Sequence, residues 1–189
     1  MLFISVYVLS TDLHLQEQLR EEIMQEISGK DLREITIEEL NGIKLLNYVI
    51  KEGLRYYPPA WANIRLAAKD LQLGDIFFPK DSAVLIPILA LHRDPASWGP
   101  TADQFLPERW DPCKSDKYPE PPRGAYIPFN IGPRDCIGAR FANLEMKLVL
   151  ASLLSKFSFT CAEGPTPKFL VAETLRPDKI MVHVKPLEN

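Results

Sequence analysis

A loop with a single cysteine carries the clearest chemical potential in this chain. Residues 129–138 read Phe-Asn-Ile-Gly-Pro-Arg-Asp-Cys-Ile-Gly, and a run of helix-forming residues follows Cys136. The partial positive charge at a helix N-terminus favours a thiolate, and the thiolate is the form of cysteine that binds metals. Gly132 and Gly138 permit positive φ or the close approach of a flat ligand, and Arg134 supplies a cation for an acidic group on that ligand. The loop therefore predicts that Cys136 is offered to a metal from a rigid turn.

A second set of residues places opposite charges one turn apart on an expected helix. Thr36 and Glu39 have capping-box spacing, and apolar residues recur at helical intervals from there to Pro58. On this helix Glu52 and Arg55 can touch. In isolation such a pair is usually solvated and contributes roughly 0.2–0.5 kcal/mol.

Three segments resemble the cytochrome P450 family, the haem-thiolate monooxygenases, and they follow one another along the chain in the family's order: residues 52–55, 105–110 and 129–138. The spacing Phe-x-x-Gly-x-Arg-x-Cys-x-Gly resembles the family's haem-binding loop, and Glu52-Gly-Leu-Arg55 resembles its Glu-x-x-Arg motif. Residues 105–110 (Phe-Leu-Pro-Glu-Arg-Trp) resemble its downstream Pro-Glu-Arg segment. The resemblance implies that Cys136 is the proximal ligand to the iron of haem b, and that Glu52, Arg55 and Arg109 form a buried cluster. The alternative for Cys136 is a buried cysteine that acts as a small hydrophobe, which five matched positions in ten residues disfavour.

The resemblance also assigns roles to residues around the haem. Arg65 and Arg134 would hold propionates, and Phe129 would pack against the ligand loop, although Arg65 has the alternative of being a surface arginine at the start of a strand. Gly132 and Gly138 would let the backbone approach haem and sulfur. Two short segments would line the substrate side: residues 60–64 (Ala60, Trp61, Ala62, Asn63 and Ile64) and residues 171–174 (Val171, Ala172, Glu173 and Thr174).

One histidine in the middle of the chain invites a metal interpretation that the sequence does not support. His92 has no second histidine, cysteine or carboxylate at metal-ligand spacing. We therefore expect His92 to be a packed or capping side chain rather than a ligand.

The activity implied by the resemblance is insertion of one atom of dioxygen into a small hydrophobic organic substrate. Electrons would come from NADPH through a partner reductase. That partner would dock on basic residues near the haem loop, namely Lys114, Lys117, Arg123, Arg140 and Lys147. The alternative is that these residues are an ordinary solvated surface.

The family's oxygen-activating segment, distal pocket and membrane anchor have no counterpart in the sequence. It is therefore interpreted as a truncated or partial haem-thiolate monooxygenase, and a full-length relative would lie at the endoplasmic reticulum membrane surface. Two alternatives remain open. One is a haem-thiolate isomerase or dehydratase, which needs the same proximal loop, and the other is a catalytically inactive fragment that binds haem weakly or not at all.

Composition narrows the class of protein further. The chain has 189 residues and a net charge of −3, so nucleic-acid binding has no electrostatic basis. Its three cysteines form no Cys-x-x-Cys pair and leave one unpartnered, which argues against a disulfide framework. The apolar residues 1–9 are far fewer than the ~20 that a membrane span needs. We interpret them as the end of a buried helix that has lost its upstream half, and as a free N-terminus this stretch would be exposed and prone to aggregate.

Periodicity and turn residues predict the elements that position these groups. Helices are expected over residues 12–27 with Gly29 as C-cap, from Thr36 to Pro58, and from the cysteine loop to about Ser155. Many of the 17 prolines fall between residues 95 and 133, which predicts an irregular meander there. Strands are expected at residues 71–73, 76–78, 83–88 and 180–184, and residues 157–159 and 174–177 resemble the C-terminal strands of the P450 family. The fold class is mainly α with a small β subdomain, the C-terminal portion of the cytochrome P450 fold, in one domain over residues 1–189.

Overall fold

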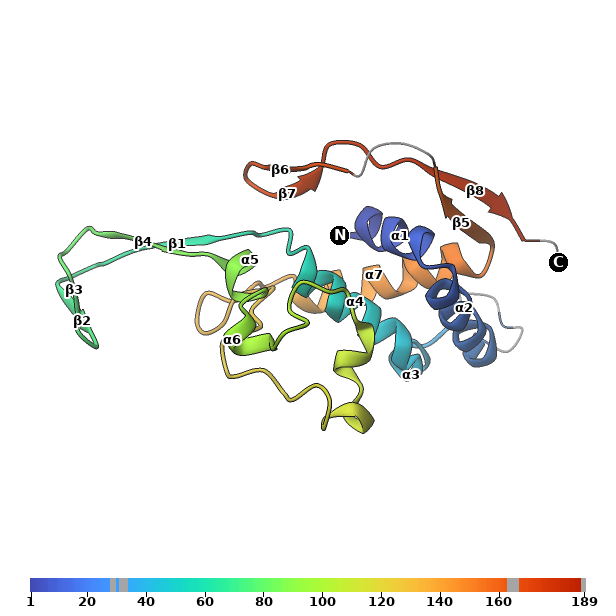
Figure 1. Ribbon diagram of the computed structural model, residues 1–189, viewed down its shortest axis with the longest axis horizontal. Coiled ribbons are helices and arrows are strands. Elements are labelled where there is room, and N and C mark those ends of the chain that lie inside the picture. The colour runs from blue at the N-terminus through green and yellow to red at the C-terminus, as the bar shows by residue number, and fades with distance from the viewer. Residues whose placement is uncertain (28–29, 31–33, 163–166, 188–189) are drawn as a thin grey trace.

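The protein is described here by a computed structural model that covers residues 1–27, 30, 34–162 and 167–187. Helices gather at the centre of the molecule, an extended arm of strands projects to one side, and the C-terminal strands run past α1 (Figure 1). The helices are α1 (Leu2–Thr11), α2 (Leu13–Ile27), α3 (Ile37–Gly42), α4 (Lys44–Tyr56), α5 (Ile88–Leu91), α6 (Pro95–Trp98) and α7 (Ala139–Leu154), with 3-10 turns η1 (Pro107–Trp110) and η2 (Pro112–Lys114). The strands are β1 (Asn63–Leu66), β2 (Leu71–Leu73), β3 (Ile76–Phe78), β4 (Ala83–Ile86), β5 (Phe157–Cys161), β6 (Phe169–Val171), β7 (Leu175–Pro177) and β8 (Val182–Pro186).

The main hydrophobic core lies between α1, α2, α4 and α7. Leu9, Leu19, Ile50 and Leu154 from these four helices are almost completely buried in one cluster, and Phe159 of β5 closes it. Burial of each such side chain contributes roughly 1.5–3 kcal/mol. This core fixes α4 and α7, the two helices that carry or follow the predicted site residues.

The apolar opening of the chain is packed rather than exposed. α1 contacts β5, α2, α4 and α7, and these contacts bury Ile4 and Leu9. Phe3 on the opposite side remains 77% exposed. The interpretation as a buried helix end is therefore confirmed for the inward face of α1, whereas the expected exposure of this stretch holds only at Phe3.

The helix expected from Thr36 to Pro58 is two helices. Its capping box is confirmed: the Glu39 N–H donates to the Thr36 hydroxyl at 3.2 Å, and the Thr36 N–H donates to the Glu39 carboxylate at 2.8 Å. The chain then breaks at Ile43, which is extended with φ −70° and ψ 92°.

The cap of α4 comes from a different helix. Glu22 of α2 accepts the N–H groups of Lys44 and Leu45 at 2.7 and 2.9 Å, which supplies partners that a helix start otherwise lacks. Ile43 is fully buried at the break. Since the capping carboxylate lies 22 residues upstream, the local periodicity gives no sign of the interruption. The other two long helices begin and end within a residue or so of their expected limits, and the predicted C-cap Gly29 lies outside the described residues.

The strands pair as four antiparallel two-stranded sheets within the described ranges: β1 with β4, β2 with β3, β5 with β8, and β6 with β7. The β2–β3 hairpin turns at Gly74-Asp75 as expected and forms the tip of the projecting arm (Figure 1). Several expected bounds are wrong. The strand expected over residues 83–88 ends at Ile86 because Ile88 begins α5, and the last strand covers Val182–Pro186 rather than residues 180–184. The strand expected over residues 157–159 continues to Cys161, and β7 begins at Leu175 rather than Thr174.

The proline-rich stretch is largely irregular, as predicted, but contains three short helical turns. α6, η1 and η2 each have proline in the first turn, where its missing N–H is tolerated. These turns wrap the stretch against α4, with which η1 shares many contacts.

Candidate functional site

The cysteine loop is closed by backbone hydrogen bonds and ends at the start of a long helix. The Cys136 N–H donates to the Phe129 carbonyl at 2.8 Å, and the Asp135 N–H donates to the Gly132 carbonyl at 3.0 Å. Gly132 has φ +87°, a conformation that favours glycine. α7 follows directly, with Gly138 as its N-cap. Cys136 is thus held at the mouth of α7 by the loop backbone rather than by its own side chain.

The cysteine lines a small cavity where α4, β1 and the loop converge. The Asn63 amide donates to the Asn130 side-chain oxygen at 2.6 Å and ties the start of β1 to the loop. The cavity measures about 210 Å³. Its lining is mainly apolar: Leu54, Pro59, Ala60, Asn63, Pro128, Phe129, Asn130 and Cys136.

The donor set of this site suits a metal that brings most of its own ligands. Cys136 is exposed, and the next residue, Ile137, is fully exposed. Within the described ranges, no three His, Cys, Asp or Glu side chains are grouped to hold a metal ion. A haem supplies four porphyrin nitrogens and needs one axial ligand from the protein, which Cys136 can give. A side chain at Gly138 would begin 3.9 Å from the cysteine sulfur, so its absence keeps the surface beside the thiol free. The residues present therefore fit a haem.

The two predicted propionate ligands follow the two asparagines that join β1 to the loop: Arg65 lies two positions after Asn63, and Arg134 lies four positions after Asn130. Arg65 is half-buried in β1 and donates to the Ile64 carbonyl at 3.0 Å. Arg134 is exposed in the loop and makes no side-chain hydrogen bond or ion pair with any residue that the structure describes. Both guanidinium groups keep donors available.

The expected cluster of Glu52, Arg55 and Arg109 is brought together in the interior. The Arg55 guanidinium donates to both oxygens of the Glu52 carboxylate, at 2.8 and 2.9 Å, and both side chains are completely buried. Arg109 Nε lies 3.6 Å from the same carboxylate. Two donors that sequence reasoning missed complete the carboxylate's partners: the Leu106 N–H at 2.9 Å and the Trp110 indole N–H at 3.0 Å. They are non-local contacts, for which the Glu-x-x-Arg spacing gives no signal.

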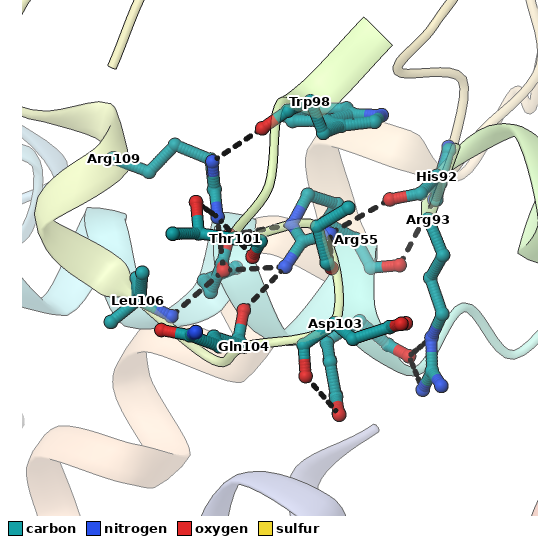
Figure 2. Close-up of polar contacts among 12 residues, drawn as sticks. Arg55, His92, Arg93, Trp98, Thr101, Asp103, Gln104, Leu106 and Arg109 are labelled. Atoms are coloured by element: carbon teal, nitrogen blue, oxygen red, sulfur yellow. Dashed lines mark hydrogen bonds and ion pairs between the residues drawn. The ribbon is translucent and has the colours of Figure 1, made fainter. Parts of the chain in front are cut away.

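The remaining donors of the cluster bind carbonyl groups of the meander (Figure 2). Arg55 donates to the carbonyls of His92 and Gln104 at 2.8 and 2.7 Å, and Arg109 donates to the Thr101 carbonyl at 2.8 Å. Burial lowers the pKa of the Arg109 guanidinium, while the Glu52 carboxylate acts in the opposite direction. The cluster therefore ties α4 to residues 92–110, which lead towards the cysteine loop.

His92 is a packed side chain, as expected. It is completely buried, with Nδ1 3.2 Å from the Arg55 carbonyl and Nε2 accepting the Ile127 N–H at 2.8 Å. Burial lowers its pKa to about 4. The imidazole is therefore neutral at physiological pH and carries its proton on Nδ1.

The structure joins the two segments expected to line the substrate side. The Trp61 indole N–H donates to the Ala172 carbonyl at 2.8 Å. Of the first segment, Ala60 and Asn63 line the cavity at Cys136, whereas Ala62 does not and Ile64 is exposed. In the second segment Val171, Glu173 and Thr174 are also exposed.

The expected basic docking residues do not form one uniform face. Lys114 and Lys117 pair with Glu108, and chiefly the Lys114 hydrogen bond lowers the pKa of Glu108 to about 2. Lys147 donates to the Asn41 side chain at 2.5 Å. Arg140 is exposed in the first turn of α7, and Arg123 lines a separate cavity beside Trp110.

None of the helices in the described part of the chain is both long and apolar enough to cross a membrane.

Comparison with known proteins agrees with this geometry. The family model "Cytochrome P450" matches residues 1–186. The chain is 40% identical over 175 residues to a cytokinin hydroxylase of Arabidopsis thaliana, covering 91% of this chain and 32% of the relative. It is 38% identical over 187 residues to cytochrome P450 3A12 of Canis lupus familiaris, covering 97% of this chain and 36% of the relative.

The fold agrees as well. The crystal structure of the cytochrome P450 CYP102L1 superposes with a TM-score of 0.86 at 28% identity, over 98% of this chain and 41% of that chain. The chain spans about a third of the length of the curated relatives that it matches. Its helices and small antiparallel sheets are thus part of the P450 fold, and the chain belongs to the cytochrome P450 family.

Proposed function

We propose that this chain supplies the proximal part of a haem-thiolate monooxygenase, with the Cys136 thiolate as the axial iron ligand. The observation that carries the proposal is the loop itself. Cys136 is exposed at the start of α7, is fixed by its N–H bond to Phe129, and is the one sulfur in the cavity formed by the loop, α4 and β1.

Several residues of the chain would each hold a different part of the cofactor. Haem bound through a thiolate supplies oxygen-activating chemistry, because the electron-rich sulfur promotes O–O cleavage. Cys136 would donate its thiolate, and Arg65 and Arg134 would neutralise the propionates through charge-assisted hydrogen bonds. Phe129 lines the same cavity as Cys136 and would pack against the ligand loop, where it would exclude water from the sulfur. Gly132 and Gly138 would let the backbone approach haem and sulfur.

The reaction proposed is insertion of one oxygen atom into a small hydrophobic organic substrate. Its entry side would be formed by the segments joined through Trp61 and Ala172. The name of one relative, cytokinin hydroxylase, describes a hydroxylation by that protein. Electrons would come from NADPH through a partner reductase that docks on basic residues, of which Arg140 lies four positions after Cys136 and is exposed. Lys114 and Lys117 would contribute less because Glu108 already pairs with them.

The test is the absorption spectrum of the reduced, carbon-monoxide-bound chain after incubation with haem. We expect a strongly red-shifted Soret band, the signature of thiolate ligation. Cys136→Ser should abolish this band, whereas Cys113→Ser and Cys161→Ser, which change two other exposed cysteines, should retain it. An unchanged band in Cys136→Ser would overturn the ligand assignment, and no thiolate band in the unmodified chain would overturn haem binding by this chain.

A further inference from the structure

His92 occupies a position between the buried ion cluster and the segment that enters the cysteine loop. It follows α5 and is fully buried, and its ring lies 5.3 Å from that of Tyr126 with an interplanar angle of 30°. Tyr126 packs in turn against Trp98 and Trp110. The imidazole is therefore clamped in one orientation between α4 and residues 126–127.

A reciprocal pair of hydrogen bonds joins His92 to Arg55. The Arg55 guanidinium donates to the His92 backbone carbonyl at 2.8 Å (Figure 2), and His92 Nδ1 lies 3.2 Å from the Arg55 backbone carbonyl. Since that carbonyl can only accept, the proton is on Nδ1. Nε2 is then an acceptor.

The donor to His92 Nε2 belongs to the segment that leads into the cysteine loop. The Ile127 N–H donates to His92 Nε2 at 2.8 Å. Ile127 is 7% exposed, so water is a poor substitute for this partner, and a buried N–H left unpaired destabilises its segment. A second contact ties the same segment to α4, because the Tyr126 hydroxyl donates to the Lys51 carbonyl at 3.2 Å. The His92 contact differs in that it satisfies a buried backbone N–H, that of Ile127.

From Ile127 the hydrogen bonds continue to the cysteine. The Ile127 carbonyl accepts the Asn130 N–H at 3.1 Å, which forms the turn, and the Phe129 carbonyl accepts the Cys136 N–H at 2.8 Å. The turn residue Asn130 has φ +69°, so its backbone depends on being held by its neighbours.

We infer that His92 is a positioning residue for the cysteine loop: its Nε2 fixes Ile127, and through the 127–130 turn it fixes the loop carbonyl that orients Cys136. The inference rests on the proposed role of Cys136 as ligand, but its structural part concerns the haem-free chain. It predicts that the acceptor atom at Nε2 matters more than the volume of the ring.

Three substitutions separate the role of Nε2 as an acceptor from the role of the ring volume. In His92→Gln the side-chain oxygen can replace Nε2 as the acceptor for Ile127. In His92→Asn the amide can replace Nδ1 as the donor to Arg55, but the acceptor for Ile127 is lost. His92→Phe keeps the volume and the stacking on Tyr126 but removes both polar contacts. His14→Phe, at an exposed histidine, is the matched control.

The first readout is hydrogen exchange of the Ile127 and Cys136 amides in the haem-free chain, with the Leu19 amide in the core as the reference for global unfolding. We expect both amides to exchange at least tenfold faster in His92→Asn and His92→Phe, and within about threefold of the unmodified chain in His92→Gln and His14→Phe. Unaltered exchange in His92→Phe, failure of His92→Gln to restore protection, or a faster Ile127 amide with an unchanged Cys136 amide would overturn the inference.

The second readout is the fraction of haem-loaded protein that shows the thiolate band. This fraction should fall in His92→Asn and His92→Phe and be restored in His92→Gln. If the unmodified chain shows no such band, the proposed function has failed, and the exchange data still decide whether His92 positions the loop.

Discussion

Replacing Glu52 with glutamine should lower the free energy of unfolding by about 3–5 kcal/mol, the usual loss when one partner of a buried ion pair is neutralised. The Glu52 carboxylate is completely buried and accepts two hydrogen bonds from Arg55, one from the Leu106 N–H and one from the Trp110 indole. Glutamine has nearly the same shape, but its NH2 group would face N–H donors, and Arg55 would remain buried without a counter-charge. Arg109, 3.6 Å away, would lose its nearest anion too.

The chain contains a matched control for this measurement. Glu17 and Arg20 have the same spacing, with Arg20 Nε 3.3 Å from the Glu17 carboxylate, but the Glu17 side chain is 59% exposed. Glu17→Gln should therefore change stability by no more than about 1 kcal/mol. Urea unfolding followed by far-ultraviolet circular dichroism gives both values under one set of conditions. A loss in Glu52→Gln no larger than that in Glu17→Gln would refute the reasoning that burial makes the Glu52 cluster important.

Two further predictions concern pH and backbone strain. Burial lowers the folded-state pKa of His92 from 6.5 to about 4, so the unfolded chain binds more protons than the folded chain between these pH values. The free energy of unfolding should therefore fall by about 2 kcal/mol when the pH is lowered from 7 to 5, as measured by urea unfolding. His92→Gln should remove most of this pH dependence. Gly132→Ala should lose about 1–2 kcal/mol in thermal unfolding because φ is +87°, with Gly132→Asn losing less because asparagine tolerates positive φ; equal losses would contradict the strain argument.

The parts of the site that sequence predicted well are those set by local chemistry. The glycines and the helix after Cys136 indicate a turn before a helix start, and the structure has α7 begin at Ala139. The capping box at Thr36 is likewise a three-residue pattern with a direct physical cause. Such features depend on neighbours along the chain, so a single sequence contains the information needed to locate them.

The parts that sequence could not predict depend on residues far apart in the chain. The interruption at Ile43 is stabilised by Glu22 of another helix. The junction between the two expected substrate segments depends on a bond from Trp61 to the carbonyl of Ala172, 111 residues away. Backbone carbonyls have no identity in the sequence, so side chains that bind them have no visible partner until the fold is known.

The two Glu-x-x-Arg pairs show why spacing alone does not identify a structural cluster. Arg20 is about as well buried as Arg109, but it donates to the Leu154 carbonyl at 2.8 Å and to Gln16 at 2.9 Å, so its charge is satisfied without much help from Glu17. At the second pair it is the glutamate that lies in the interior, where four donors converge on it. An exposed carboxylate can exchange its partner for water, whereas a buried one cannot. The Glu52–Arg55 pair could be told from an ordinary helix pair only because the Pro-Glu-Arg segment and the cysteine loop follow it along the chain. Those later segments supply the contacts that bury the pair, and the spacing of the pair itself does not encode them.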